Sequence, residues 1–273
     1  MDRRRIEWLF FIVFLLIDLY LGIEIWRSPI KLSNTTGTTA ISIRAEMRAD
    51  GIDVPLHISH KQQSGYYLAA KNSDYLSRKT SSLTKVSAHY AKAENALTGT
   101  PKSPQLLNGN HKKILEQLDD FKNDPTCVPY GKKFKYDPST SSGNTYCYVQ
   151  NSDYGQIYDN NAQLTINLRD NRIVDYKITY MGPINAVREP QLIISAWHAV
   201  KAMYTDSEIA NNSRVIKVSL GYSKLTEVRG NTILLPTWLI LVENKTTKNI
   251  MIKRVNAFTA QILQSSSYNV RKN

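Results

Sequence analysis

Histidine, cysteine and acidic residues are the side chains through which this sequence could do chemistry, and their spacing decides which chemistry that is. His57 and His60 lie three residues apart, but in an extended segment this spacing places them on opposite faces, so they make a poor metal pair. Three further histidines stand alone: His89, His111 and His198. The sequence contains no G-x-S-x-G, phosphate loop, H-E-x-x-H or C-x-x-C motif. We therefore predict no catalytic residues, no metal ligands and no cofactor.

Asp18 is the acidic residue with the most unusual surroundings, because it lies two residues past the midpoint of the apolar run Ile6 to Trp26. In a bilayer, a carboxylate at this depth costs roughly 2.5–3.5 kcal/mol, and a partner is expected to offset that cost. On a helix Asp18 shares one stripe with Phe11, Leu15, Gly22 and Ile25. Gly22 would let another backbone approach closely. These five residues are a candidate transmembrane interaction face. The alternative is an acid that snorkels to the interface or stays protonated against lipid.

The run from Ile6 to Trp26 has the length and the flanks of a transmembrane helix. At ~1.5 Å per residue it spans roughly 30 Å, the thickness of the hydrocarbon core. Trp8 and Trp26 suit the two interfaces, and the arginines at 3–5 hold the N-terminus in the cytoplasm. A cleaved signal peptide is the alternative, but the run is long for one and no small-x-small cleavage pattern follows it. We expect a cytoplasmic tip (1–5), a single-pass membrane anchor (6–26) and a bulk that is extracytoplasmic.

The charge balance points to polyanionic surroundings. The formal net charge is +12, which suits a surface that faces anionic lipid heads or wall polymers. Nucleic acid is the usual partner of such a charge, but the expected topology argues against it. A basic solvated surface without a specific partner explains the charge equally well.

Cys127 and Cys147 are the only two cysteines, and an exported location allows a disulfide to persist. Such a bridge would close a loop of about 20 residues and contribute on the order of 3 kcal/mol. Neither has a histidine or a second cysteine at ligand spacing, so zinc is disfavoured. The pair is a candidate disulfide, with two free thiols as the alternative.

The residues after the anchor predict a linker (27–39) and a first α+β domain (40–125). The features expected in this domain are a helix capped by Thr39 that runs through Ile41 to Asp50 and is ended by Gly51, extended segments at 54–59 and 66–71 with Gly65 as the turn, a loop or weak helix at 77–104, and a helix at 112–122 capped by Asn110 and ended by Asp124-Pro125.

From Thr126 the chain becomes rich in tyrosine, strand patterns and turns, which predicts a second α+β domain (126–273). The expected elements are a hairpin of 164–168 and 173–181 around Asp170-Asn171, a helix at 189–204, and strands at 215–222, 233–242 and 250–258. Pro236 inside the second of these strands predicts an edge strand or a bulge. The expected fold class is α+β, with a helix packed on an antiparallel sheet.

Five segments resemble a known family. The anchor sequence FFIVFLLIDLYL resembles the opening of the YycI (WalI) proteins, which are membrane-anchored regulators of the cell-wall histidine kinase WalK (YycG) in Gram-positive bacteria. Four later segments resemble the C-terminal domain of the same family: Gln191 to Tyr204, LGY at 220–222, LPTW at 235–238 and VNAFTAQIL at 255–263. Residues 52–130 match the family only in position and length, and the cysteine pair is no known feature of the family.

This resemblance implies two extracytoplasmic α+β domains, related in fold to the companion regulator YycH, and an adaptor role without catalysis. It also implies that the anchor helix contacts the transmembrane helices of the kinase and of YycH. Two alternatives come from the residues: an exported wall-binding or ligand-binding module, and a cell-wall hydrolase that uses scattered carboxylates.

Overall fold

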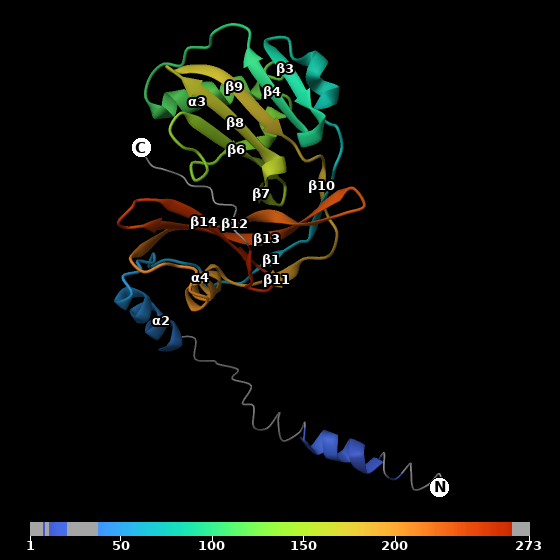
Figure 1. The fold of residues 1–273 in the computed structure, drawn as a ribbon, viewed down its shortest axis with the longest axis vertical. Coiled ribbons are helices and arrows are strands. Elements are labelled where there is room, and N and C mark those ends of the chain that lie inside the picture. Colours follow the sequence, from blue (N-terminus) through green and yellow to red (C-terminus); the bar gives the residue numbers. More distant parts are fainter. Residues whose placement is uncertain (1–7, 9–10, 21–37, 264–273) are drawn as a thin grey trace. The chain divides into compact units, whose positions relative to one another are not determined.

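A computed structural model describes residues 8, 11–20 and 38–263 in two compact units, Met1–Arg44 and Ala45–Asn273 (Figure 1). In the first unit, residues 11–20 are helical. No helix within the described residues is both long and apolar enough to cross a membrane. The predicted anchor lies partly outside the described residues. Helix α2 (Thr38–Ala49) matches the predicted helix, although Thr39 lies inside it, and Gly51 follows with φ +71°.

The second unit is a mixed α+β structure in which one stretch of chain is inserted between two neighbouring strands. Strands β2 (Leu68–Lys71) and β10 (Ile184–Ala186) pair antiparallel, and residues 72–183 run between them. We call residues 72–183 the inserted lobe. The rest of the second unit, residues 45–71 and 184–263, is the base lobe. The described strands form one 13-stranded sheet that runs through both lobes and one two-stranded sheet within the base lobe.

The inserted lobe is an antiparallel sheet covered by one helix. Its strands are β3 (Val86–Ala91), β4 (Ala96–Pro101), β5 (Phe134–Tyr136), β6 (Thr145–Ser152), β7 (Gly155–Ile157), β8 (Gln163–Arg169) and β9 (Arg172–Thr179). The order β5-β6-β8-β9-β4-β3 makes most neighbours local hairpins. Asp170 and Asn171 both have positive φ, as a two-residue type I′ turn requires. The predicted hairpin is therefore confirmed.

Helix α3 (His111–Asn123) is also confirmed, together with its cap. The Asn110 side chain accepts a hydrogen bond from Lys113 N at 3.1 Å, and Leu118 and Phe121 are buried. The stretch 77–104 was predicted as loop or weak helix, but it holds the β3–β4 hairpin. Its small Ser and Ala residues have little intrinsic strand preference, and pairing of β4 with β9 decides the structure.

The base lobe is built around one long central strand. Its strands are β1 (Gln63–Gly65), β2, β10, β11 (Gln191–Ile193), β12 (Ser213–Val228), β13 (Asn231–Asn244), β14 (Ile250–Asn256) and β15 (Ile262–Leu263). Three of them confirm the strands predicted at 215–222, 233–242 and 250–258. The segment 54–59, predicted as extended, contains no strand, and Gly65 ends β1 instead of forming a turn.

Pro236 does not mark an edge or a bulge, contrary to the prediction. Strand β13 pairs with β12 along its whole length, while its other side pairs with β2 up to Leu234 and with β14 from Thr237. Proline lacks a backbone donor, so it is accommodated where one neighbour has ended and the next begins.

Helix α4 (Ala196–Thr205) begins seven residues later than the predicted helix at 189–204. Ile193 belongs to strand β11, and the Ser195 side chain caps the helix by accepting from His198 N at 3.2 Å. Ile193 fits the apolar spacing of the helix although it belongs to a strand, so the predicted helix began too early. The cap residue Ser195 is the signal that separates the strand from the helix.

Two of the apolar clusters show how the sheets are buried. One core lies between α3 and the sheet of the inserted lobe, with residues on both sides of position 126, such as Phe121 and Tyr176. Strand pairing and this core therefore cross the domain boundary predicted there. A second layer joins the lobes, where Val149 and Tyr158 of the inserted lobe pack on Leu239 and Leu241 of β13.

Candidate functional site

Three of the five residues of the predicted membrane face lie in the described helix. Phe11, Leu15 and Asp18 fall within helical residues 11–20, at spacing that keeps them on one side. Phe11 and Leu15 are 62% and 51% exposed. Gly22 and Ile25 lie outside the described residues. The described part of the face is thus a helical strip of exposed apolar side chains with one acid.

Cys127 and Cys147 are free, buried thiols, so the candidate disulfide is not formed. Cys127 lies in the core beneath α3 together with Tyr146 and Tyr148. Cys147 stands between these two tyrosines on β6, and side chains alternate along a strand, so it faces the opposite side of the sheet. Burial raises the pKa of both thiols. Their sequence separation allowed a bridge, but the sheet lies between them.

The histidines do not meet in one place. His57 lies in a segment without regular structure, and the ring of His60 lies 5.6 Å from the ring of Trp197. His111 stacks on Tyr146 with ring centroids 5.9 Å apart. Over the part of the chain that the structure describes, no group of three or more His, Cys, Asp or Glu side chains is arranged to hold a metal ion.

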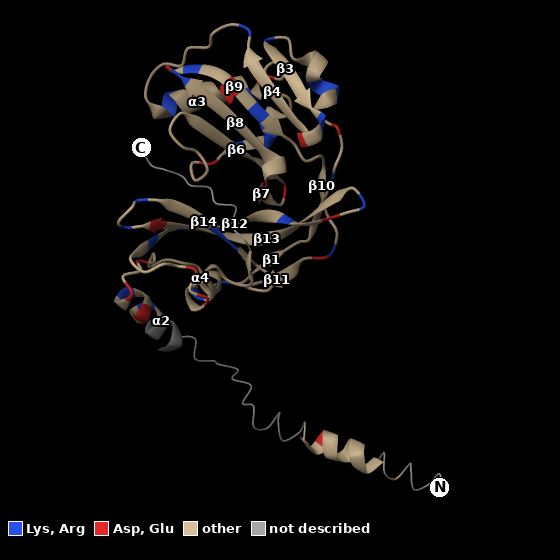
Figure 2. Cartoon of the chain, viewed as in Figure 1, with Lys and Arg blue, Asp and Glu red and all other residues tan. Residues whose placement is uncertain are grey.

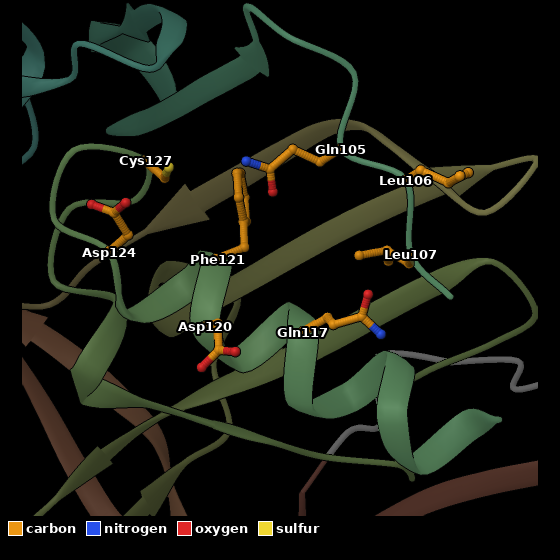
Figure 3. A pocket seen from close by; sticks show the side chains of 8 residues that line it. All are labelled: Gln105, Leu106, Leu107, Gln117, Asp120, Phe121, Asp124 and Cys127. Atoms are coloured by element: carbon orange, nitrogen blue, oxygen red, sulfur yellow. The ribbon is translucent and has the colours of Figure 1, made fainter. Parts of the chain in front are cut away.

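A hollow of about 360 Å³ lies between α3 and the segment 105–107 in the inserted lobe (Figure 3). In Figure 3, Phe121 rises from α3 toward Gln105. Gln117 fixes the neighbouring segment, because its Nε2 donates to Asn108 O at 2.8 Å and its Oε1 accepts from Asn108 N at 3.2 Å. Asp124 at the rim is held by Lys85 at 2.7 Å. Gln117 and Asp124 thus bind neighbouring parts of the chain, which gives this hollow a structural role.

A second hollow, of about 420 Å³, lies beside β12 in the base lobe. We call it the β12 groove. One wall is formed by residues of the segment 55–59, the other by residues 216–220 of β12, and Ala196 and Trp238 also line it. The indole N–H of Trp238 donates to Ile194 O at 2.9 Å, so this polar group is already satisfied. The groove offers an aromatic and aliphatic lining next to a strand edge.

The segments that carry the family resemblance converge beside this groove. Leu220 and Trp238 line it. Pro236 O accepts from Ala257 N at 2.9 Å, and Ala257 O accepts from Ile194 N at 2.8 Å. Three motifs far apart in the sequence are therefore bonded into one region. The Asn256 side chain accepts from Phe258 N at 2.9 Å, at the turn that follows β14.

Basic residues occur on helices, strands and loops of both lobes (Figure 2). Several are paired, as in Lys177–Glu94 at 2.6 Å and Lys253–Glu208 at 2.7 Å. Lys217 lines the β12 groove and is exposed, and Lys61, which is also exposed, lies in the chain between the lining residues Ser59 and Gln63. The groove therefore has a basic border.

The fold defines a mixed α+β protein built on an antiparallel-dominated sheet with few helices. The chain belongs to the YycI family, because the family model described as YycI protein matches residues 30–258. A regulatory role in the system of the YycG (WalK) histidine kinase goes with this family.

Three solved structures show distant similarity. An uncharacterized protein from Eubacterium rectale is 10% identical with a TM-score of 0.46, over 80% of this chain and 92% of that chain. The C-terminal domain of Bacillus megaterium YpeB is 12% identical with a TM-score of 0.37, over 84% and 98%. YycH from Bacillus subtilis is 8% identical with a TM-score of 0.44, over 71% and 53%. No curated protein sequence matches the chain. The family assignment therefore rests on the family model.

Proposed function

We propose that this YycI family protein is a non-catalytic, membrane-anchored adaptor that modulates a WalK/YycG-like histidine kinase through its N-terminal helix, together with a YycH-like regulator. The observation that carries the proposal is Asp18 within an apolar helical strip whose described side chains are exposed. An acid in such a strip has a reason to be there if another helix offsets its cost.

The proposed topology follows from the same segment. The arginines at 3–5 keep the N-terminus in the cytoplasm, and the run 6–26 anchors the chain as a single pass. The folded unit then lies outside the cytoplasm, at the membrane surface. Its basic surface is compatible with anionic lipid or wall polymer nearby, and nucleic acid is not proposed as a partner.

Replacing the acid tests the helix contact directly. Asp18→Leu makes the helix more apolar and keeps it in the membrane. We expect it to lower recovery of the kinase and the YycH-like regulator from mild detergent by about tenfold, because a contact that offsets a cost of a few kcal/mol is lost. Expression of the kinase's target genes should change with it.

Val13→Leu is the matched control, since Val13 lies in the same helical stretch but off the Asp18 stripe. It should change neither co-purification nor gene expression. If Asp18→Leu behaves like this control at equal protein level, the helix is only a tether, and the regulatory contact lies in the folded unit.

A further inference from the structure

The outer edge of β12 has a gap. Its inner edge pairs with β13 from Ser213 to Val228. On its outer side, Asp53 forms a parallel bridge with Arg214, and β7 pairs in parallel at Tyr222. Between these two points, no strand among residues 38–263 pairs with the outer edge. The position of a neighbouring strand is thus filled at both ends and open in the middle.

The backbone groups in this gap point outward. Ser213 O and Val215 N bond to Asp53 at 2.9 and 2.8 Å, and Tyr222 O accepts from Tyr158 N at 2.7 Å. Backbone groups alternate in direction along a strand. Counting back from Tyr222 by twos, the N–H and C=O groups of Leu220 and Val218 therefore point to the outer edge. The register shift between Val215 and Lys217 moves this alternation by one residue, which is why Val215 also points outward.

The groove beside the gap accepts side chains. Residues 216–220 both carry the open edge and line the β12 groove, with Trp238 among the other lining residues. Ile216 is 42% exposed. The open stretch 216–221 spans roughly 20 Å at strand spacing. A peptide that added to this edge would gain main-chain hydrogen bonds and bury alternate side chains in the groove.

The charges at this edge select the occupant. Lys61 and Lys217 are exposed. The acidic Asp53 nearby is already paired with Lys245 at 2.9 Å. A second copy of this chain, added through the same edge, would place the Lys217 side chains of both copies at one interface. Lysine and bulges on edge strands oppose such self-pairing, whereas an acidic segment is attracted.

We propose that residues 216–221 of β12 bind an extended, acidic peptide segment of another protein by strand addition. The side chains of the segment enter the β12 groove, and its carboxylates face Lys61 and Lys217. This contact lies on the folded unit and is independent of the helix contact at Asp18.

The probe is a fluorescein-labelled ten-residue peptide of alternating valine and glutamate, titrated with the full-length protein in detergent and followed by fluorescence anisotropy. We expect saturable binding. The same peptide with lysine in place of glutamate should bind at least about threefold more weakly, because its charge opposes Lys61 and Lys217. Amide hydrogen exchange at Val218 and Leu220 should slow when the valine–glutamate peptide is bound.

Two variants separate the contribution of main-chain hydrogen bonds to peptide binding from the contribution of charge. Val218→Pro removes an outward donor, which an edge position tolerates, and should weaken binding about tenfold. Lys217→Glu should weaken binding of the acidic peptide about threefold and strengthen that of the lysine peptide. Lys135→Glu, at an exposed lysine of β5, is the control with the same charge change and should alter neither. Thermal unfolding shows whether each variant is folded.

Three outcomes overturn the proposal. The first is no saturable binding, or equal binding by a folded Val218→Pro protein. The second is a dimer without peptide that Val218→Pro or Lys217→Glu dissociates, which assigns the edge to a second copy. The third is binding that occurs only after truncation at Leu263, which assigns the edge to the chain's own C-terminal residues. Because none of these readouts involves the kinase, they are independent of the Asp18 experiment.

Discussion

The two lobes of the folded unit bury their sheets in different ways. In the inserted lobe, α3 and the sheet β3–β9 enclose a core made from one continuous stretch of chain. In the base lobe, β13 is buried on both faces, with Trp238 bonded to Ile194 on one face and Leu239 packed against the inserted lobe on the other. The inserted lobe therefore has a core of its own, while the base lobe depends on the inserted lobe to cover its sheet.

A pair of large-to-small substitutions tests this dependence and should have the largest effect. Trp238→Ala and Phe121→Ala each remove a buried aromatic ring and should each cost about 3–5 kcal/mol in free energy of unfolding. Hydrogen exchange should separate them. Trp238→Ala should speed exchange in β13 and leave β8 and β9 protected, whereas Phe121→Ala should speed exchange in all three strands, because loosening the inserted lobe uncovers β13.

Equal acceleration of β8, β9 and β13 in the Trp238→Ala protein would contradict the asymmetry. It would mean that the lobes open as one cooperative unit.

A buried lysine inside the inserted lobe gives an intermediate effect. Lys122 Nζ donates to Gly131 O at 3.2 Å and to Phe134 O at 3.1 Å, which fastens the loop before β5 to α3. Lys122→Met leaves these carbonyls without that donor and should cost roughly 2 kcal/mol by chemical denaturation. Lys132→Met, at an exposed lysine of the same loop, should stay within about 0.5 kcal/mol of the parent protein.

The pH dependence of the same variant gives a second readout. Burial lowers the pKa of Lys122 from its ordinary 10.5, so the unfolded chain holds this proton more strongly than the folded chain. The parent protein should therefore gain stability relative to Lys122→Met as pH rises from the lowered pKa toward 10.5. A relative loss of stability over this window would show that the protonated amine is the favoured buried form.

Acid titration of one carboxylate in each lobe should have the smallest effect on the free energy of unfolding. Lys85 and Thr126 hold the pKa of Asp124 far below its usual 3.8, so its contribution is present above about pH 4 and is lost as pH falls below it. With Lys85 largely exposed, the loss should be about 1 kcal/mol or less. In acid titrations of the free energy of unfolding, the Asp124→Asn protein should not show this loss.

Asp53→Asn is the matched variant in the base lobe. Lys245 lowers the pKa of Asp53 as well, but this carboxylate is exposed to solvent, which screens the interaction. Its acid response should therefore be smaller than that of Asp124. An equal or larger response would show that the ion pairs of the base lobe matter more to stability than those of the inserted lobe.

Elements with strong local signals could be predicted from the sequence. Asn110 and Asp124-Pro125 bound α3, and Asp170-Asn171 forms the predicted turn between β8 and β9. The β3–β4 hairpin could not be predicted, because its strand character depends on pairing with β9, more than 70 residues later in the sequence.

The candidate sites show the same limit. Asp18 was identified from its apolar neighbours alone. The open edge of β12 required knowledge of which strands pair with it, and the sequence contains no such signal. The apolar run around Leu239 and Leu241 does contain a signal for burial, because a strand with apolar residues at successive positions is covered on both faces.

The insertion of residues 72–183 between β2 and β10 also sets an order of assembly during synthesis. At about 5–20 residues per second, roughly 5–20 seconds pass between the making of β2 and of its partner β10. The inserted lobe can complete its hairpins and core within that interval, since its contacts are mostly local. Strands β1 and β2 have no such opportunity, because all their partners are made later. Strands β1 and β2 therefore wait for their first partners, β11 and β10, and they remain open to a chaperone until the chain has passed Ile193.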